Sequence, residues 1–273
     1  YMTVLKLHDS YIESPFLRGA FDLDVLYVLG KSFYEMGLYA KAREFLYRVI
    51  QKWPSKEVDE HCGYLIGVTY LREGIFTRAE EILRKHLDFF PRGKYRNEML
   101  YALGEATYNQ GKYPEAIAAL GQFLVAQPES PRAVAAFYFI GNSLFTLKKY
   151  LEASEAYVSV LAVAARQKSK EVPTAVLESH FQLADSFYMA GLYEPALIAY
   201  GEAYRLSSKG EKGEWAQYRM SYIKELLNSP NAGLKGFEAL ASSPDPMWQT
   251  ISSGLRDFAR AQEVYRGYFR APE

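Results

Sequence analysis

Small and apolar residues recur along this chain at a constant distance of 37 residues, and residues 97–128 show the recurring unit most clearly. The pattern of this segment predicts two short helices that run antiparallel. A glycine follows the small residue Gly104 by seven positions, an aromatic residue by nine, an alanine by twelve and a proline by twenty-four. Because the same offsets return up and down the sequence, the chain is a repeat protein.

Six copies of the unit are present, each marked by its small reference residue. The first four are separated by 37 residues, the fifth follows after 43, and the sixth, which is degenerate, follows after 37 more. These copies predict one all-α array over residues 23–245. The reference residues are Gly30, Gly67, Gly104, Gly141, Ala184 and Ser221.

The other recurring residues have definite physical roles. The reference residue and the alanine twelve positions later are small, so the two helices of a copy can approach closely. Glycine ends the first helix in four copies because it takes the left-handed conformation at little cost, whereas the fourth copy has Lys148 there. Proline stops the second helix in the first three copies. The turn glycines are Gly37, Gly74, Gly111 and Gly191, and the prolines are Pro54, Pro91 and Pro128.

This order of small residue, aromatic residue, alanine and proline resembles the tetratricopeptide repeat family. The resemblance covers residues 23 to about 245. It implies a right-handed α-α superhelix of five clear repeats and a degenerate sixth, stabilised by contacts between neighbouring repeats. It also implies that one face of the first helices lines a concave groove, which holds a protein or peptide.

Two segments flank the array. Residues 1–22 are expected to form an N-terminal helix or partial repeat, because one helical face carries Val4, Leu5, His8, Tyr11 and Ile12, and the array is expected to continue upstream. Residues 246–273 are expected to form a capping helix. Its predicted apolar face carries Met247, Ile251, Leu255, Phe258 and Tyr265.

The groove is predicted to carry two aromatic rows, one three positions before each reference residue and one four positions after it. The surrounding charges are mostly acidic, which favours a partner with basic residues. The alternative is that the aromatic side chains only wedge neighbouring helices together. The predicted groove residues are Tyr27, Lys31, Tyr34, Tyr64, Arg72, Tyr101, Glu105, Tyr108, Tyr138, Asn142, Phe145, Phe181, Asp185 and Tyr188.

Composition argues against other classes of function. Thirty-two basic and thirty-two acidic residues cancel, so neither nucleic acid nor a membrane surface is an expected partner. The apolar runs are too short for insertion into a membrane. The four histidines belong to different helices, and none stands at metal-ligand spacing with Cys62 or with carboxylates. No catalytic residue, metal or cofactor is therefore expected.

Residues 89–104 and 123–141 resemble the joins between repeats in bacterial envelope tetratricopeptide proteins. Examples are the lipoprotein of the outer-membrane β-barrel assembly machinery and the periplasmic coordinator of the Tol–Pal system. The resemblance implies a periplasmic scaffold in an envelope or motility assembly, with a cytoplasmic adaptor as the alternative. A second alternative is an accessory domain of an enzyme whose catalytic part lies outside this chain.

Overall fold

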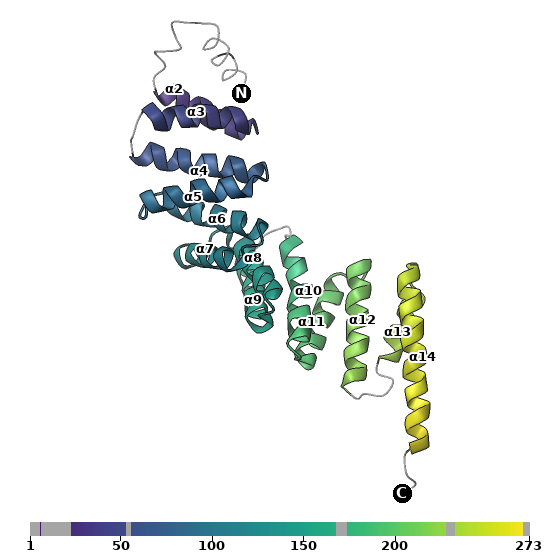
Figure 1. The fold of residues 1–273 in the computed structure, drawn as a ribbon. Coiled ribbons are helices and arrows are strands. Elements are labelled where there is room, and N and C mark those ends of the chain that lie inside the picture. The colour runs from purple at the N-terminus through teal and green to yellow at the C-terminus, as the bar shows by residue number, and fades with distance from the viewer. Residues whose placement is uncertain (1–5, 7–22, 53–55, 168–173, 228–232, 270–273) are drawn as a thin grey trace. The chain divides into compact units, whose positions relative to one another are not determined.

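The computed structural model describes residues 6, 23–52, 56–167, 174–227 and 233–269. Within these residues every regular element longer than a turn is an α-helix, and successive helices form antiparallel hairpins (Figure 1). The predicted all-α repeat fold is thereby confirmed. The helices are α2 (Leu23–Glu35), α3 (Tyr39–Lys52), α4 (Lys56–Arg72), α5 (Phe76–Phe89), α6 (Arg96–Asn109), α7 (Tyr113–Ala126), α8 (Ala133–Thr146), α9 (Tyr150–Gln167), α10 (Thr174–Met189), α11 (Tyr193–Leu206), α12 (Glu211–Leu226), α13 (Leu234–Leu240) and α14 (Pro246–Phe269).

The chain divides into two compact units, Tyr1–Ser143 and Leu144–Glu273. In the first unit, the hairpins α2–α3, α4–α5 and α6–α7 stack so that each second helix contacts the first helix of the next hairpin. In the second unit, α10 packs between α9 and α11, and α12 packs against α11, α13 and α14. The core of each unit is buried between helices, as expected for repeats that cannot cover their own apolar faces.

The two helices of a hairpin meet at the reference glycine. A Cβ atom added to Gly104 would lie 2.4 Å from Cγ of Leu120, and one added to Gly67 would lie 2.6 Å from a methyl carbon of Leu83. In both copies the leucine stands sixteen positions after the glycine. The alanine at twelve positions is fully buried beside it, as in Ala116. Glycine is therefore required here by steric contact with a defined side chain.

The turn residues have the predicted conformation. Gly37, Gly74, Gly111 and Gly191 all have a positive φ, between 73° and 77°. Lys148, which replaces glycine in the fourth copy, takes the same left-handed conformation with a φ of 60°. An amino acid with a Cβ pays a steric penalty there, so the turn geometry is dictated by the fold rather than by the residue.

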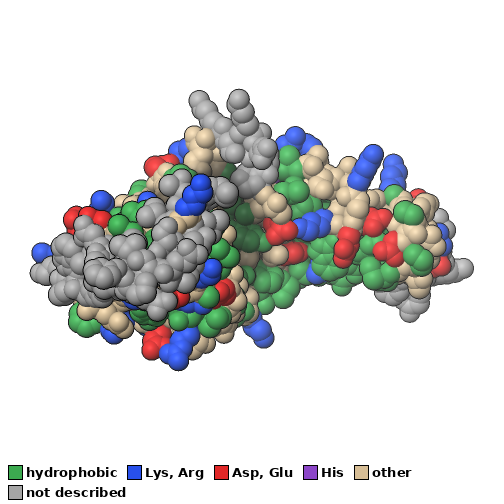
Figure 2. All heavy atoms as spheres, turned by 90° about the horizontal axis from the view of Figure 1, so that it is seen from above, with side chains coloured by type: hydrophobic (Ala, Val, Ile, Leu, Met, Phe, Trp, Pro, Cys, Tyr) green, Lys and Arg blue, Asp and Glu red, His purple; other side chains and the backbone are tan. Residues whose placement is uncertain are grey.

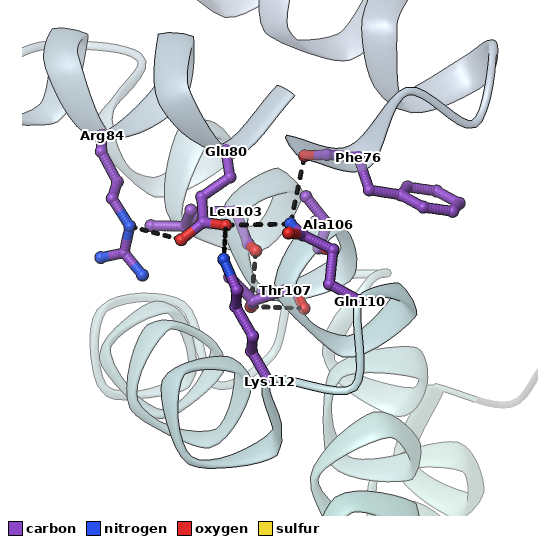
Figure 3. Close-up of polar contacts among 9 residues, drawn as sticks. Phe76, Glu80, Arg84, Leu103, Ala106, Thr107, Gln110 and Lys112 are labelled. Atoms are coloured by element: carbon purple, nitrogen blue, oxygen red, sulfur yellow. Dashed lines mark hydrogen bonds and ion pairs between the residues drawn. The ribbon is translucent and has the colours of Figure 1, made fainter. Parts of the chain in front are cut away.

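A buried carboxylate links the second hairpin to the third (Figure 3). Glu80 of α5 is 8% exposed and accepts hydrogen bonds from Lys112 Nζ at 2.7 Å and Gln110 Nε2 at 2.9 Å, both from the turn after α6. Arg84, one turn along α5, donates to its other oxygen at 2.8 Å. Burial raises the pKa of Glu80, but the three hydrogen bonds together outweigh it, so the pKa is lowered.

The first and second hairpins are joined by an ion pair at the equivalent positions. Here the second helix, α3, provides the basic residue and the turn after α4 provides the acidic one. Arg43 stands thirteen positions after its reference glycine, as Glu80 does, and donates to Glu73 at 2.6 Å and to Thr69 at 3.3 Å. The side chain at this position of the second helix is therefore positively charged at the first interface and negatively charged at the second.

Helix α14 takes the place of a first helix, since it contacts both helices of the preceding pair, α12 and α13. Its first turn is capped by Asp245, whose Oδ1 accepts from the Met247 amide at 2.8 Å. A Cβ added to Gly254 would meet nothing within 4 Å, so no second helix packs there within the described residues.

The predicted apolar face of this helix is wrong by one position. Trp248 and Ser252 are the buried residues, 3% and 0% exposed, whereas Met247 and Ile251 are 50% and 40% exposed. The reason is that α14 packs against α12 and α13 with the same face that the first helix of a repeat uses. No described helix covers its opposite side. The side chains of Phe258 and Tyr265, the expected helix in residues 1–22 and the proline at 54 lie outside the described residues.

Candidate functional site

In the first unit, predicted groove residues from α2 and α4 come together with His61 and with Tyr95, which the sequence pattern did not single out. The Tyr27 hydroxyl lies in hydrogen-bonding contact with Nδ1 of His61. The His61 ring is stacked on Tyr95, with the centroids 4.2 Å apart, and the Tyr64 ring lies about equally far from both, 6.2 Å from His61 and 6.1 Å from Tyr95. These four half-buried residues form an aromatic stack that runs from α2 to the start of α6.

The imidazole of this stack is held in its neutral form. Burial, aided by the charges of Lys31 and Lys94, lowers the pKa of His61 from 6.5 to about 4. The predicted residue Lys31 is itself exposed on α2. The stack is therefore an uncharged aromatic surface at neutral pH.

Further along the same unit, the aromatic face becomes charged. The Arg132 guanidinium lies 5.2 Å from the Tyr101 ring centroid, and Arg72 pairs with Glu105 at 3.6 Å. Burial and the nearby Glu105 charge raise the pKa of Tyr101 to about 12, and burial raises the pKa of Glu105 against the two arginines. Glu98 has one buried carboxylate oxygen with no hydrogen-bond partner among the described residues.

The aromatic residues four positions after the reference have a packing role inside their own hairpins. Each lies edge-on or tilted against the aromatic residue five positions later, with centroids 5.3–6.2 Å apart. Tyr108 also contacts Phe139 and accepts a 3.4 Å hydrogen bond from Asn142, and Tyr138 contacts Phe139. The pairs are Tyr34–Tyr39, Tyr108–Tyr113, Phe145–Tyr150 and Tyr188–Tyr193.

The second unit contains a cavity of about 750 Å³ between α10, α12 and α14. Two of its residues, Phe181 and Asp185, were predicted groove residues, and a third, Tyr188, lies beside it against Arg219. The other lining residues are Glu178, Gln182, Glu211, Lys212, Trp215, Tyr218, Arg219, Met247, Trp248 and Ile251.

One carboxylate is built into the wall of this cavity. Asp185 accepts hydrogen bonds from the Tyr200 hydroxyl and, at 3.4 Å, from Nε1 of Trp215. Burial raises the pKa of Asp185, against these two hydrogen bonds and the charge of Arg219, which lower it. The guanidinium of Arg219 lies between two rings, 4.3 Å from the Trp215 centroid and 4.2 Å from that of Tyr188.

The faces that carry these residues are less acidic than the sequence suggested. Arg132, Lys212 and Arg219 bring positive charge to them, and Lys212 pairs with Glu178 at 2.7 Å. Figure 2 shows acidic and basic side chains interspersed over the face in view. The arginines and lysine were missed because they stand two or nine positions before the reference, where the copies share no residue type.

Three further features of the described residues bear on metal binding, thiol reactivity and membrane insertion. Among the described residues no three His, Cys, Asp or Glu side chains are grouped so that they could hold a metal ion. Cys62 is buried, and burial raises the pKa of its thiol to about 12. Of the helices in the described part of the chain, none is long and apolar enough to span a membrane.

Comparison with known proteins gives the following similarities. A family model described as an outer membrane lipoprotein, YfiO, matches residues 56–184, and a tetratricopeptide repeat model matches residues 24–55. The fold is similar to that of MamA AMB-1, with 21% identity, a TM-score of 0.56, and 69% of this chain and 93% of that chain covered. For MamA MSR-1 the identity is 21%, the TM-score 0.54 and the coverage 68% and 97%. A search of curated protein sequences gives no match.

Proposed function

This chain belongs to the tetratricopeptide repeat family, and from that premise we propose that it is a non-catalytic scaffold which holds a polypeptide against the first helices of its first unit. The family binds protein partners.

The aromatic stack is the observation that carries the proposal. Tyr27, His61, Tyr64 and Tyr95 are half-buried, so their rings are fixed by packing while part of each remains accessible. Rigid aromatic side chains provide a large contact area at low cost in conformational entropy, which is why they dominate binding hot spots. Tyr101 on α6 stands three positions before its reference glycine, as Tyr27 and Tyr64 stand before theirs, and its ring packs edge-on against Phe123.

The partner's polar chemistry follows from the charged part of this face. Glu105 makes one ion pair among the described residues, with Arg72 at 3.6 Å. A lysine or arginine of a partner would pair more closely with this carboxylate. An apolar or aromatic segment with an adjacent basic residue therefore fits the surface best.

The cellular setting is proposed as the bacterial envelope, on the periplasmic side. It is supported by the outer membrane lipoprotein model over residues 56–184, and a cytoplasmic location is the alternative. Fractionation of cells that make the tagged, full-length protein tests this: recovery with the periplasmic or outer-membrane fraction is expected, and recovery with the cytosol would refute it.

The binding surface is tested by site-specific photo-crosslinking. A photoreactive phenylalanine analogue at the position of Tyr64 is expected to crosslink the partner, whereas the same analogue at Tyr204, on the second helix α11, is not. The double variant Tyr101→Ala and Glu105→Gln should weaken the partner's Kd by about tenfold or more while helical circular dichroism is unchanged. Equal crosslinking from both positions, or an unchanged Kd, would refute the surface.

A further inference from the structure

Glu60 is a buried carboxylate on α4 that binds the main chain of the turn between α5 and α6. It is 3% exposed, and its two oxygens accept hydrogen bonds from the amides of Lys94 at 3.0 Å and Tyr95 at 2.6 Å. It makes no ion pair with any side chain that the structure describes. Burying a carboxylate without donors costs free energy, and here main-chain amides supply them. The carboxylate therefore holds this turn directly against α4.

The turn is shaped to receive the carboxylate. A Cβ added to Gly93 would lie 2.0 Å from Oε1 of Glu60 and 2.6 Å from Oε2, so glycine is what allows the close approach. Tyr95 is the N-cap residue of α6, and its own side chain does not cap the helix. Glu60 thus supplies both an acceptor and a negative charge at the end of α6 where the helix dipole favours them.

The same turn carries one ring of the aromatic stack. The rings of Tyr95 and His61 are nearly parallel, with 12° between their planes, and His61 directly follows Glu60 on α4. The ammonium of Lys94 lies 5.6 Å from the Tyr95 ring centroid. Of the four residues of the stack, Tyr95 alone lies outside a helix, one position before α6 begins. Its place in the stack therefore depends on how the turn is held.

The second unit uses a carboxylate at the same offset in a similar way. Glu214 stands seven positions before its reference residue, as Glu60 does. It accepts a hydrogen bond from the Ser243 hydroxyl, whose oxygen accepts from the amide of Asp245 at 3.1 Å, directly before α14. In the copies between these two the position is not acidic. A carboxylate at this offset thus fixes the segment that leads into the next first helix.

We propose that Glu60 is a positioning residue of the polypeptide-binding surface: its two hydrogen bonds fix the turn after α5 so that Tyr95 is held on His61 and completes the aromatic stack. The inference rests on the surface proposed above, because it concerns how one of the residues of that surface is held. Glu60 is buried and acts on a partner only through Tyr95. Loss of its hydrogen bonds would open the stack without removing any of the four rings.

The test compares two variants that break this contact from opposite sides with one that leaves it intact. Glu60→Gln keeps the size of the side chain but replaces one acceptor oxygen with a donor group, which cannot accept from an amide. Gly93→Ala places a methyl group where the carboxylate lies. Glu57→Gln is the control, because Glu57 is exposed on the same helix. Circular dichroism is expected to show that all three variants retain their helices.

The first readout is the chemical shift of the imidazole protons of His61, which His61→Gln identifies among the four histidines. The ring current of Tyr95 affects these protons, and Tyr95→Leu gives their position without that ring. Glu60→Gln and Gly93→Ala are expected to move the resonances most of the way to this position, and Glu57→Gln to leave them in place. Unmoved resonances in both test variants would overturn the proposal.

The second readout is the titration of the same imidazole. Its midpoint is expected to rise from about 4 toward 6.5 in Glu60→Gln and Gly93→Ala, because the ring gains solvent and Lys94 moves away from it. Removal of the negative charge at position 60 would by itself lower the midpoint, since a nearby anion favours the imidazolium. A lowered midpoint in Glu60→Gln would therefore show an effect of charge without displacement of Tyr95, and would overturn the proposal.

Binding is measured with the fluorescein-labelled peptide Gly-Phe-Leu-Lys-Gly-amide, which carries the aromatic, apolar and basic groups that the surface fits. Glu60→Gln and Tyr95→Leu are each expected to weaken its Kd about threefold or more. Because Glu60 acts through Tyr95, the double variant should bind no more weakly than Tyr95→Leu alone. A loss in the double variant equal to the product of the two single losses would overturn the proposal. No binding to the unsubstituted protein at about 1 mM would instead refute the chemistry proposed for the surface, while the His61 resonances still decide the role of Glu60.

Discussion

Gly104 and Leu120 are so close that a Cβ on the glycine would lie 2.4 Å from Cγ of the leucine. The leucine side chain thus occupies the volume that any other residue at 104 would need. The same relationship joins Gly67 to Leu83. Contact between the helices of these two repeats therefore depends on the absence of one methyl group.

Gly104→Ala is expected to destabilise the protein by about 1–3 kcal/mol, because Cγ of a buried leucine cannot move away without disturbing the core. Gly121 on α7 is the matched control, since a Cβ there would meet nothing within 4 Å. Gly121→Ala should stabilise the protein by about 0.5–1 kcal/mol through helix propensity. Urea denaturation followed by circular dichroism measures both; the same sign for both would contradict the packing argument.

Lys148→Gly is expected to stabilise the protein by up to about 1 kcal/mol, since lysine has a φ of 60° in a turn where glycine is unstrained. The reciprocal change, Gly111→Ala, is expected to destabilise it by about 1 kcal/mol. Thermal denaturation of both variants is a sufficient measurement. A less stable glycine variant at 148 would show that the lysine side chain contributes more than its strain costs.

Glu80→Gln is expected to lower the free energy of unfolding at pH 7 by about 1.5–3 kcal/mol, because hydrogen bonds to the charged form from Lys112, Arg84 and Gln110 are lost or weakened. The pKa of Glu80 is below its ordinary value of 4.5 in the folded state. Its contribution is therefore fully present above about pH 4.5 and is lost as the pH falls through the lower, folded pKa.

The neighbouring Glu81 serves as a control for that measurement. Its carboxylate pairs with Arg78 at 2.6 Å, but both side chains are more than half exposed. Glu81→Gln should change stability by less than about 0.5 kcal/mol. If the difference between Glu80→Gln and the parent protein did not shrink in acid, the buried link would have no electrostatic role.

His61 is expected to titrate with a midpoint near pH 4, because its folded pKa is lowered from 6.5 to about 4. Between these values the unfolded state binds more protons, so stability is full above pH 6.5 and falls as the pH drops toward 4. The chemical shift of the imidazole Cε1 proton measures the midpoint directly. His61→Gln should remove this part of the pH dependence, and a midpoint above pH 6 would mean that the ring is not buried in the aromatic stack.

The repeating elements could be predicted from the sequence because they are local. Glycine at the turn and small residues at the helix contact follow from backbone geometry, and both were found where the offsets placed them. The expectation that the aromatic rows serve only packing is supported for the row four positions after the reference, which pairs within its own hairpin.

The polar parts of the candidate sites could not be predicted in the same way. Tyr95, Arg132 and Arg219 reach their positions by packing between neighbouring repeats, and no residue type recurs at their offsets. The buried face of α14 was also missed. Trp248 stands six positions before Gly254, as Trp215 does before Ser221, but the step between these references is 33 residues instead of 37.

The opposite charges of Arg43 and Glu80 at the first two interfaces restrict how the number of repeats can change in evolution. Arrays of similar units readily lose one by unequal recombination of their genes. Removal of the 37 residues of the second copy would bring Arg43 against Gln110, which stands 37 positions after Glu73, with Lys112 two positions further on. The shortened chain would lose the ion pair of Arg43 and bring a second positive charge near it, so these interfaces preserve the order of the units as well as their attachment.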